Sequence, residues 1–347
     1  MGWIGKLFGG GDGDKPASAP ASAVPPSSAV PASSAVPATV AEPGASGPAG
    51  AAEVDAAYYR WLTSAGWPQA TPDTERRILA ELARLGQSPE SGAALVPRVP
   101  DIIPQLLRTL RDENMNAADL SRQMAKDLVL VAEVYREANR PRYRPRYHSG
   151  PPVDSMEAAI MLLGQNGMRM LLARVALRPV LSLQSGTLVK RAAPLVWSQS
   201  EKCALAASIL APAARANAFE AYLAGLIENV GLVVALRLVD MACRDGALPQ
   251  SDEFIAGLFA GARLLSARIA RLWDFPETVA EAIADAGQPD AWSLAETLTL
   301  ADRLGKLRML VDAARLSPDD PFVTAGLDRA ALACFERLRD EDEDEEV

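Results

Sequence analysis

The chain has very few histidines, cysteines and aromatic residues. Its 347 residues include a single histidine, His148, and three cysteines, and aromatic side chains make up only 5%. Because most acid–base and metal-assisted hydrolytic sites use imidazole, one histidine disfavours much of enzyme chemistry. The cysteines form no Cys-x-x-Cys pair, so the sequence offers neither a disulfide framework nor a thiolate zinc site. We therefore expect no metal and no cofactor, and the free thiols fit a reducing cytoplasm.

Long hydrophobic runs and an excess of basic residues are also missing. The most apolar stretch, residues 221–242, contains Glu228, Asn229, Arg237 and Asp240. Burying these polar groups in hydrocarbon would be costly, so we expect no transmembrane helix. The net charge is −9, but seven acidic residues lie in the tail at 340–347, and the remaining 37 acids nearly balance the 35 bases. Non-specific binding to nucleic acid is therefore not expected.

Residues 11–50 have the composition of a linker. They are nearly all Gly, Ala, Ser, Pro and Val, and Ser-Ala-Val-Pro recurs every six residues from Ser22, Ser28 and Ser34. Regular proline removes backbone donors and favours extended polyproline II, and the segment has little apolar surface to bury. It is predicted to be a disordered tether.

A short apolar peptide, residues 1–10, precedes this linker. Four large apolar side chains lie at one-turn spacing beside a single lysine: Trp3, Ile4, Leu7 and Phe8. Such a peptide can dock on a membrane surface or in the groove of a partner protein. The alternative is a disordered terminus whose apolar residues have no role.

From residue 51 onward the hydrophobic pattern is helical. Apolar residues between 99 and 110 recur at the i, i+3, i+4 spacing of one helix face, and no strand-like alternation of comparable length occurs. Helix start signals include Thr71-Pro72 and a capping box at Ser293 and Glu296. The fold class expected is all-α, with added helices at 51–95 before the main domain and at 301–339 after it.

Several short motifs resemble, in order and spacing, those of the HDOD domain. They are Val-Pro-Arg-Val-Pro at 96–100, Lys-Asp-Leu-Val-Leu at 126–130, Glu-Ala-Asn at 137–139, Ala-Ile-Met-Leu-Leu-Gly at 159–164, Val-Trp-Ser-Gln-Ser at 196–200, Ala-Gly-Leu-Ile-Glu-Asn-Val-Gly at 224–231 and Leu-Trp-Asp-Phe-Pro-Glu at 272–277. The resemblance covers residues 96–300. It implies a compact multi-helix bacterial signalling module that is related to HD-type phosphohydrolases but lacks their metal ligands.

The resemblance also locates the remnant of a hydrolase site. An HD hydrolase holds divalent metals with imidazoles and carboxylates, including a His-Asp pair, and the metal generates the nucleophile. The matching positions are Gln199, Glu228, Asn229 and Asp302. Glu228 and Asp302 could offer oxygen ligands to Mg²⁺. The interpretation we favour is that Glu228 and Asn229 satisfy helix ends inside a former site.

An arginine-rich segment, residues 135–148, is the second candidate site. Prolines interrupt its helix, so we expect a loop that presents Arg140, Arg142, Arg144 and Arg146. Guanidinium groups bind phosphate or carboxylate in bidentate fashion, which would suit a nucleotide or an acidic partner. The alternative is a solvated loop without a ligand.

Together these features predict a cytoplasmic, non-enzymatic regulatory protein that acts by protein–protein interaction in a bacterial signalling pathway. Docking of the N-terminal peptide would place it at the inner membrane. Two alternatives remain at this point: a module that senses a nucleotide without hydrolysing it, and a residual metal-dependent phosphohydrolase.

Overall fold

Helices form nearly all the regular structure of the part of the chain that can be described. The computed structural model describes residues 50–64, 68–87, 128–140, 151–182, 186–243, 246–288 and 292–339. The N-terminal peptide, the linker up to residue 49, the helix expected at 99–110 and the acidic tail all lie outside these residues. So do Arg142, Arg144 and Arg146.

The all-α prediction is confirmed. Across the described residues the chain pairs strand-like only at one isolated bridge between Gln69 and Leu248. The helices, in chain order, are α2 (Ala51–Thr63), α3 (Pro72–Gln87), α6 (Leu128–Ala138), α7 (Met156–Ser182), α8 (Thr187–Leu210), α9 (Ala218–Ile227), α10 (Val230–Ala242), α11 (Asp252–Leu272), α12 (Glu277–Asp285), α13 (Ser293–Asp312), α14 (Pro321–Thr324) and α15 (Arg329–Glu336).

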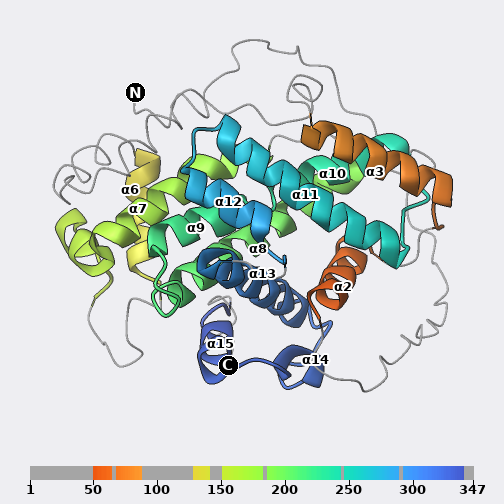
Figure 1. Ribbon diagram of the computed structural model, residues 1–347. Helices are drawn as coiled ribbons and strands as arrows, with labels where there is room; N and C mark the ends of the chain where they lie inside the picture. The colour runs from red at the N-terminus through yellow and green to blue at the C-terminus, as the bar shows by residue number, and fades with distance from the viewer. Residues whose placement is uncertain are drawn as a thin grey trace, which may run out of the picture.

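Helix α8 runs through the middle of the molecule and organises the core. It packs against α7, α9, α10, α13 and α15 and also contacts α2 (Figure 1). Helix α11 forms a second centre, in contact with α2, α3, α10 and α12. One continuous cluster of buried apolar side chains joins all these elements. The N-terminal helices α2 and α3 are therefore part of the same core as the helices that follow.

The helix starts predicted from local sequence patterns are confirmed only in part. Helix α3 begins at Pro72, and the Thr71 hydroxyl accepts a hydrogen bond from the Thr74 amide, as expected. The capping box expected at Ser293 is wrong by one position, because Trp292 is the N-cap of α13 and its side chain forms no capping bond. Gly164, the last residue of the motif at 159–164, lies within α7 and kinks this helix with a φ of 65°.

The apolar stretch Ala218–Ala242 lies inside the protein. By length and hydropathy it could cross a membrane, yet 94% of its most apolar window is buried among other helices. It comprises α9 and α10, which turn at Glu228 and Asn229. Of the four polar residues that argued against a membrane span, Glu228 and Asn229 lie at this corner in the core, whereas Arg237 and Asp240 are half-buried residues of α10.

The added helices are continuous with the main domain. Glu75 of α3 accepts hydrogen bonds from the amides of Gln250 and Ser251, directly before α11. Arg60 of α2 forms an ion pair with Asp252. Helix α13 runs across position 300, where the sequence suggested a boundary.

Candidate functional site

The corner between α9 and α10 places a polar pair in an apolar environment. The side chains of Glu228 and Asn229 are almost fully buried. Gly225 and Gly231 flank them, and a Cβ at either position would lie 2.7 Å or less from an atom of α8 or α11. The lack of side chains at these glycines lets the corner sit directly between the two central helices.

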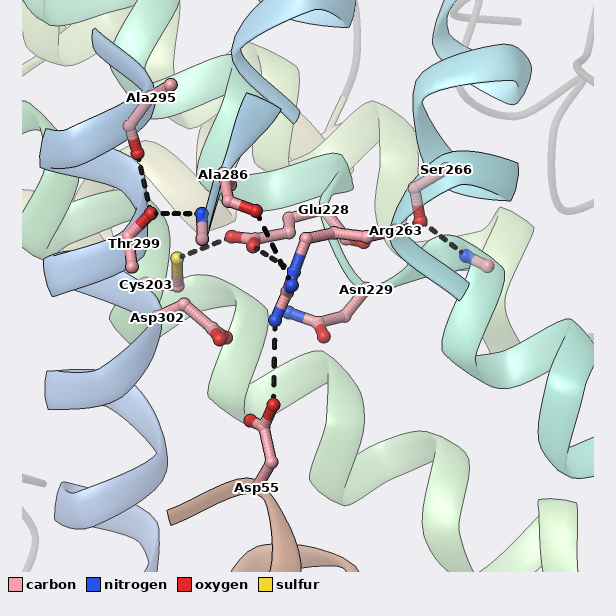
Figure 2. A network of polar contacts seen from close by, with 12 residues as sticks. Asp55, Cys203, Glu228, Asn229, Arg263, Ser266, Ala286, Ala295, Thr299 and Asp302 are labelled. Carbon is pink, nitrogen blue, oxygen red and sulfur yellow. Dashed lines mark hydrogen bonds and ion pairs between the residues drawn. The ribbon is translucent and has the colours of Figure 1, made fainter. Parts of the chain in front are cut away.

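Helix α11 satisfies the backbone of this corner. The Ser266 hydroxyl donates to the carbonyl of Glu228 at 2.5 Å. It also accepts a hydrogen bond from the amide of Gly231 at 2.8 Å (Figure 2). The Asn229 side chain forms no capping bond, although Asn229 occupies the N-cap of α10. The expectation that Glu228 and Asn229 serve the helix ends is therefore wrong, because both side chains point to other buried polar groups.

Gln199 of α8 joins the corner to α13. Its amide oxygen accepts from Asn229 Nδ2 at 2.8 Å, and its Nε2 donates to Asp302 Oδ1 at 2.7 Å. A buried amide without partners would be destabilising, so this chain of bonds fixes the orientation of three side chains. The structure thus brings together Gln199, Asn229 and Asp302, which the family resemblance had pointed out, next to Glu228.

A lysine occupies the middle of the cluster. Lys306 lies one helical turn after Asp302, is 1% exposed, and places its Nζ 2.5 Å from Asp302 Oδ2 and 2.5 Å from Asp55 Oδ1. Its ammonium also lies 4.4 Å from the centre of the Phe259 ring. Burial favours the neutral amine, but the Asp302 and Asp55 carboxylates outweigh burial and raise the pKa of Lys306. The cluster therefore has a permanent internal cation.

Arg263 of α11 supplies a second positive charge. Its Nη2 lies 3.5 Å from Asp55 Oδ2 and its Nε lies 3.6 Å from Glu228 Oε1. Figure 2 shows its guanidinium between these two acids, with Asp55 approaching from α2 and Asp302 from α13. Its Nη1 donates to the carbonyl of Ala286 at 3.4 Å.

Burial also determines the protonation of Glu228. Burial raises the pKa of Glu228 to about 8, and the Asp302 carboxylate adds to the rise. With a neutral Glu228, the cluster contains two cations, Lys306 and Arg263, and two anions, Asp55 and Asp302. Such a balance avoids an uncompensated buried charge, which would be strongly destabilising.

Three groups in the cluster are close enough together to suggest a metal site. The donor atoms of Cys203, Glu228 and Asp302 all lie within 4.8 Å of one another. Burial, with Glu228 and Asp302 adding to it, raises the pKa of the Cys203 thiol well above its usual value. Both oxygens of Asp302 already accept hydrogen bonds, and a metal requires deprotonated ligands. These residues do not fit a divalent metal, because two protonated donors face an already neutralised aspartate beside two fixed cations.

Three members of the cluster were missed from the sequence: Asp55, Arg263 and Lys306. Lys306 could have been found from the sequence, because it follows Asp302 by four residues in α13 and such a pair of opposite charges shares one helix face. No sequence pattern indicates Asp55 or Arg263, because their proximity depends on how α2 and α11 pack.

Of the four arginines expected in the loop of the arginine-rich segment, only Arg140 lies within the described residues. Arg140 Nη1 lies 3.6 Å from Glu137 Oε2, and Glu137 also pairs with Arg174 at 2.9 Å. Arg140 is thus part of an ion-pair group at the end of α6.

Comparison with known proteins matches the region of the chain in which the sequence motifs resemble the HDOD domain. Residues 96–289 match the model of the HDOD domain. A solved HDOD domain protein of unknown function from Geobacter sulfurreducens is 20% identical, with a TM-score of 0.53 over 75% of this chain and 94% of that one. A candidate metal-dependent phosphohydrolase from Shewanella amazonensis SB2B is 18% identical, with a TM-score of 0.52 over 77% and 98%. No curated protein gives a match. At these identities the two structures show a shared fold.

Proposed function

This chain belongs to the HDOD domain family, and we propose that it is a non-enzymatic regulatory protein that acts in signal transduction through contacts with other proteins. The proposal starts from the chemistry of the buried cluster. The family resemblance places the metal centre of an HD hydrolase at Gln199, Glu228, Asn229 and Asp302. Here Asp302, one of those positions, contacts the ammonium group of Lys306.

The observation that carries the proposal is the position of Lys306. Its Nζ is within 2.5 Å of two carboxylates that could otherwise bind a cation. A divalent metal would have to displace this ammonium from Asp302 and would add two positive charges to a neutral cluster. Amide side chains at Gln199 and Asn229 cannot replace imidazole as strong metal ligands or as proton carriers.

Metal analysis tests this proposal directly. The full chain, purified from cells grown with added iron, manganese and zinc, should contain no stoichiometric transition metal. It should also show no metal-dependent hydrolysis of bis-p-nitrophenyl phosphate in the presence of Mn²⁺.

The informative comparison uses three variants. Stoichiometric metal that is lost in Glu228→Ala and in Asp302→Ala, but kept in the exposed control Glu281→Ala, would overturn the proposal and support a residual phosphohydrolase. Far-UV circular dichroism of each variant shows whether loss of metal reflects loss of folding.

The partner and the location of the protein belong to the same proposal. We propose a cytoplasmic protein whose residues 1–10, with Trp3, Ile4, Leu7 and Phe8, dock on the inner membrane or on a partner. Sedimentation of the full chain with anionic lipid vesicles, compared with a Trp3→Ser/Phe8→Ser variant, tests the membrane arm. Equal sedimentation would contradict docking to lipid.

A further inference from the structure

A small cavity opens next to the buried cluster, between α2, α11 and α13. Its volume is about 230 Å³. Asp55, Glu228 and Asp302 form part of its lining, as do Arg263 and Arg303, and the exposed Ala256 and Ala260 of α11 also line it. The cavity is therefore open to solvent and bordered by two guanidinium groups.

Arg303 has no ionic partner in the described part of the chain. Its Nη2 donates to the carbonyl of Ala325 at 3.1 Å, while its Nε is buried without any hydrogen-bond partner. Burial lowers the pKa of Arg303, and no neighbouring carboxylate offsets this effect. Arg303 borders the cavity and has no carboxylate partner among the described residues, so an anion in the cavity would give its guanidinium group the negatively charged acceptor that it lacks.

Arg263 also has unused hydrogen-bonding capacity. A guanidinium has five N–H donors, yet the one hydrogen bond that Arg263 forms within the described residues is the 3.4 Å contact with Ala286. Its distances of 3.5 and 3.6 Å to the carboxylates of Asp55 and Glu228 are longer than a good charge-assisted bond.

The acids in the lining do not cancel these two arginines. Asp55 and Asp302 are each within 2.5 Å of the Lys306 ammonium, which neutralises much of their charge. Counting Lys306, the cluster and cavity hold three cations, Arg263, Arg303 and Lys306. The lining thus has room for one more negative charge.

We propose that this cavity binds a small oxyanion, a carboxylate or a phosphate group, between Arg263 and Arg303. The inference rests on the proposed function in one respect, because it gives the regulatory protein a ligand in place of a metal. Both anions are planar or multidentate acceptors that match guanidinium donors. Binding pockets for drug-sized molecules usually exceed about 300 Å³. A cavity of about 230 Å³ therefore suits a small anion better than a whole nucleotide.

Thermal unfolding of the full chain with added anions tests the proposal. Phosphate and, in a separate series, succinate should raise the midpoint in a saturable manner by a few degrees, because a ligand bound only by the native state stabilises it. Sodium chloride at matched ionic strength should give no saturable rise. The anion that saturates at the lower concentration identifies the preferred chemistry.

Two variants separate the cavity from other anion sites. Arg303→Gln should weaken binding at least tenfold, whereas the exposed Arg315→Gln, just beyond the same helix, should bind as the wild type does. Ala256→Trp keeps both arginines but fills the opening of the cavity from an exposed position, so it should fold normally and also lose binding.

The results that would overturn the oxyanion site differ from those that would overturn the proposed function. Absence of saturable stabilisation by either anion, or equal affinity in wild type, Arg303→Gln and Ala256→Trp, would overturn the oxyanion site. Neither result depends on metal content or hydrolysis, which test the regulatory proposal on their own.

Discussion

Among single residues, Lys306 is the one whose removal should destabilise the protein most. Lys306→Met would leave Asp302 and Asp55 buried next to each other with no ammonium between them. Breaking a buried ion pair on one side typically costs about 3–5 kcal/mol. We expect a decrease of that order in the free energy of unfolding, measured by urea denaturation.

A control and a double variant distinguish the ion pair from the loss of a side chain. Lys190→Met, at an exposed position of α8, should change stability by about 0.5 kcal/mol or less. Adding Asp55→Asn to Lys306→Met should recover part of the loss, because it removes one unpaired charge. Strict additivity of the two changes would contradict the coupling seen in the structure.

Glu228 makes stability depend on pH. Burial holds the proton of its carboxyl up to about pH 8, whereas in an unfolded chain that proton leaves near the ordinary pKa of 4.5. Between these values the folded state binds more protons than the unfolded state, so the free energy of unfolding falls as pH rises. A shift of this size corresponds to a loss on the order of a few kcal/mol by about pH 9.

Replacing Glu228 isolates this contribution. Glu228→Gln keeps a neutral side chain at every pH, so its stability should match that of the wild type near pH 5 and exceed it near pH 9. The exposed Glu281→Gln on α12 should follow the wild-type profile. Parallel profiles for wild type and Glu228→Gln, measured by urea denaturation across this range, would contradict a protonated Glu228.

At the scale of elements, α2 divides the N-terminal region into two parts with different roles. Deletion of residues 1–49 should leave the thermal midpoint almost unchanged, because that segment has the composition of a linker and Gly50 still provides the first turn of α2. Deletion through residue 71 should lower it by many degrees. That deletion removes the fully buried Tyr58, Tyr59 and Leu62 together with Asp55.

Differential scanning calorimetry of the two deletions measures this difference. A large drop already on removal of residues 1–49 would mean that Trp3, Ile4, Leu7 and Phe8 pack back on the folded protein. That result would contradict the tether.

Helix positions could be predicted because their causes are local. The stop and start at Glu228 and Asn229 and the proline at residue 72 act within a few residues. The kink at Gly164 could not be predicted, because a glycine in the sequence does not tell whether the chain reverses direction or only bends. The N-cap of α13 is Trp292, one residue before the Ser293 that the capping-box pattern indicates.

At the scale of the whole molecule, the family segment cannot complete its own centre. Residues 96–289 contain Gln199, Glu228, Asn229 and Arg263, but Asp55, Asp302 and Lys306 lie outside them. A fragment of residues 96–289 would leave buried polar groups without their partners. We expect it to retain helical far-UV dichroism, lose its near-UV signal and bind ANS, as a molten globule does.

A longer fragment is the matched control. Residues 50–339 include all described helices, so this fragment should unfold in one cooperative transition. Cooperative unfolding of the 96–289 fragment would show that the flanking helices are dispensable.

The sequence predicted part of the site and could not predict the remainder. Gln199, Glu228 and Asn229 could be identified because they lie in motifs of the family resemblance, whereas Asp302 follows the last of these motifs and was a candidate only as a carboxylate that could bind Mg²⁺. The ammonium between two acids could not, because it requires α2 to pack across α11 and α13, which no local pattern specifies. The cavity beside Arg303 is a further product of packing, and the arginine loop lies mostly outside the described residues.

The salt bridge between Asp55 and Lys306 also determines when the protein can finish folding during its synthesis. The two residues are 251 positions apart. At translation rates of roughly 5–20 residues per second, α2 leaves the ribosome roughly 10–50 s before Lys306 is made. During that interval the apolar face of α2, with Tyr58 and Tyr59, has no completed core to enter. Ribosome profiling with bound chaperones should therefore show nascent chains engaged until the segment that encodes α13 has been translated.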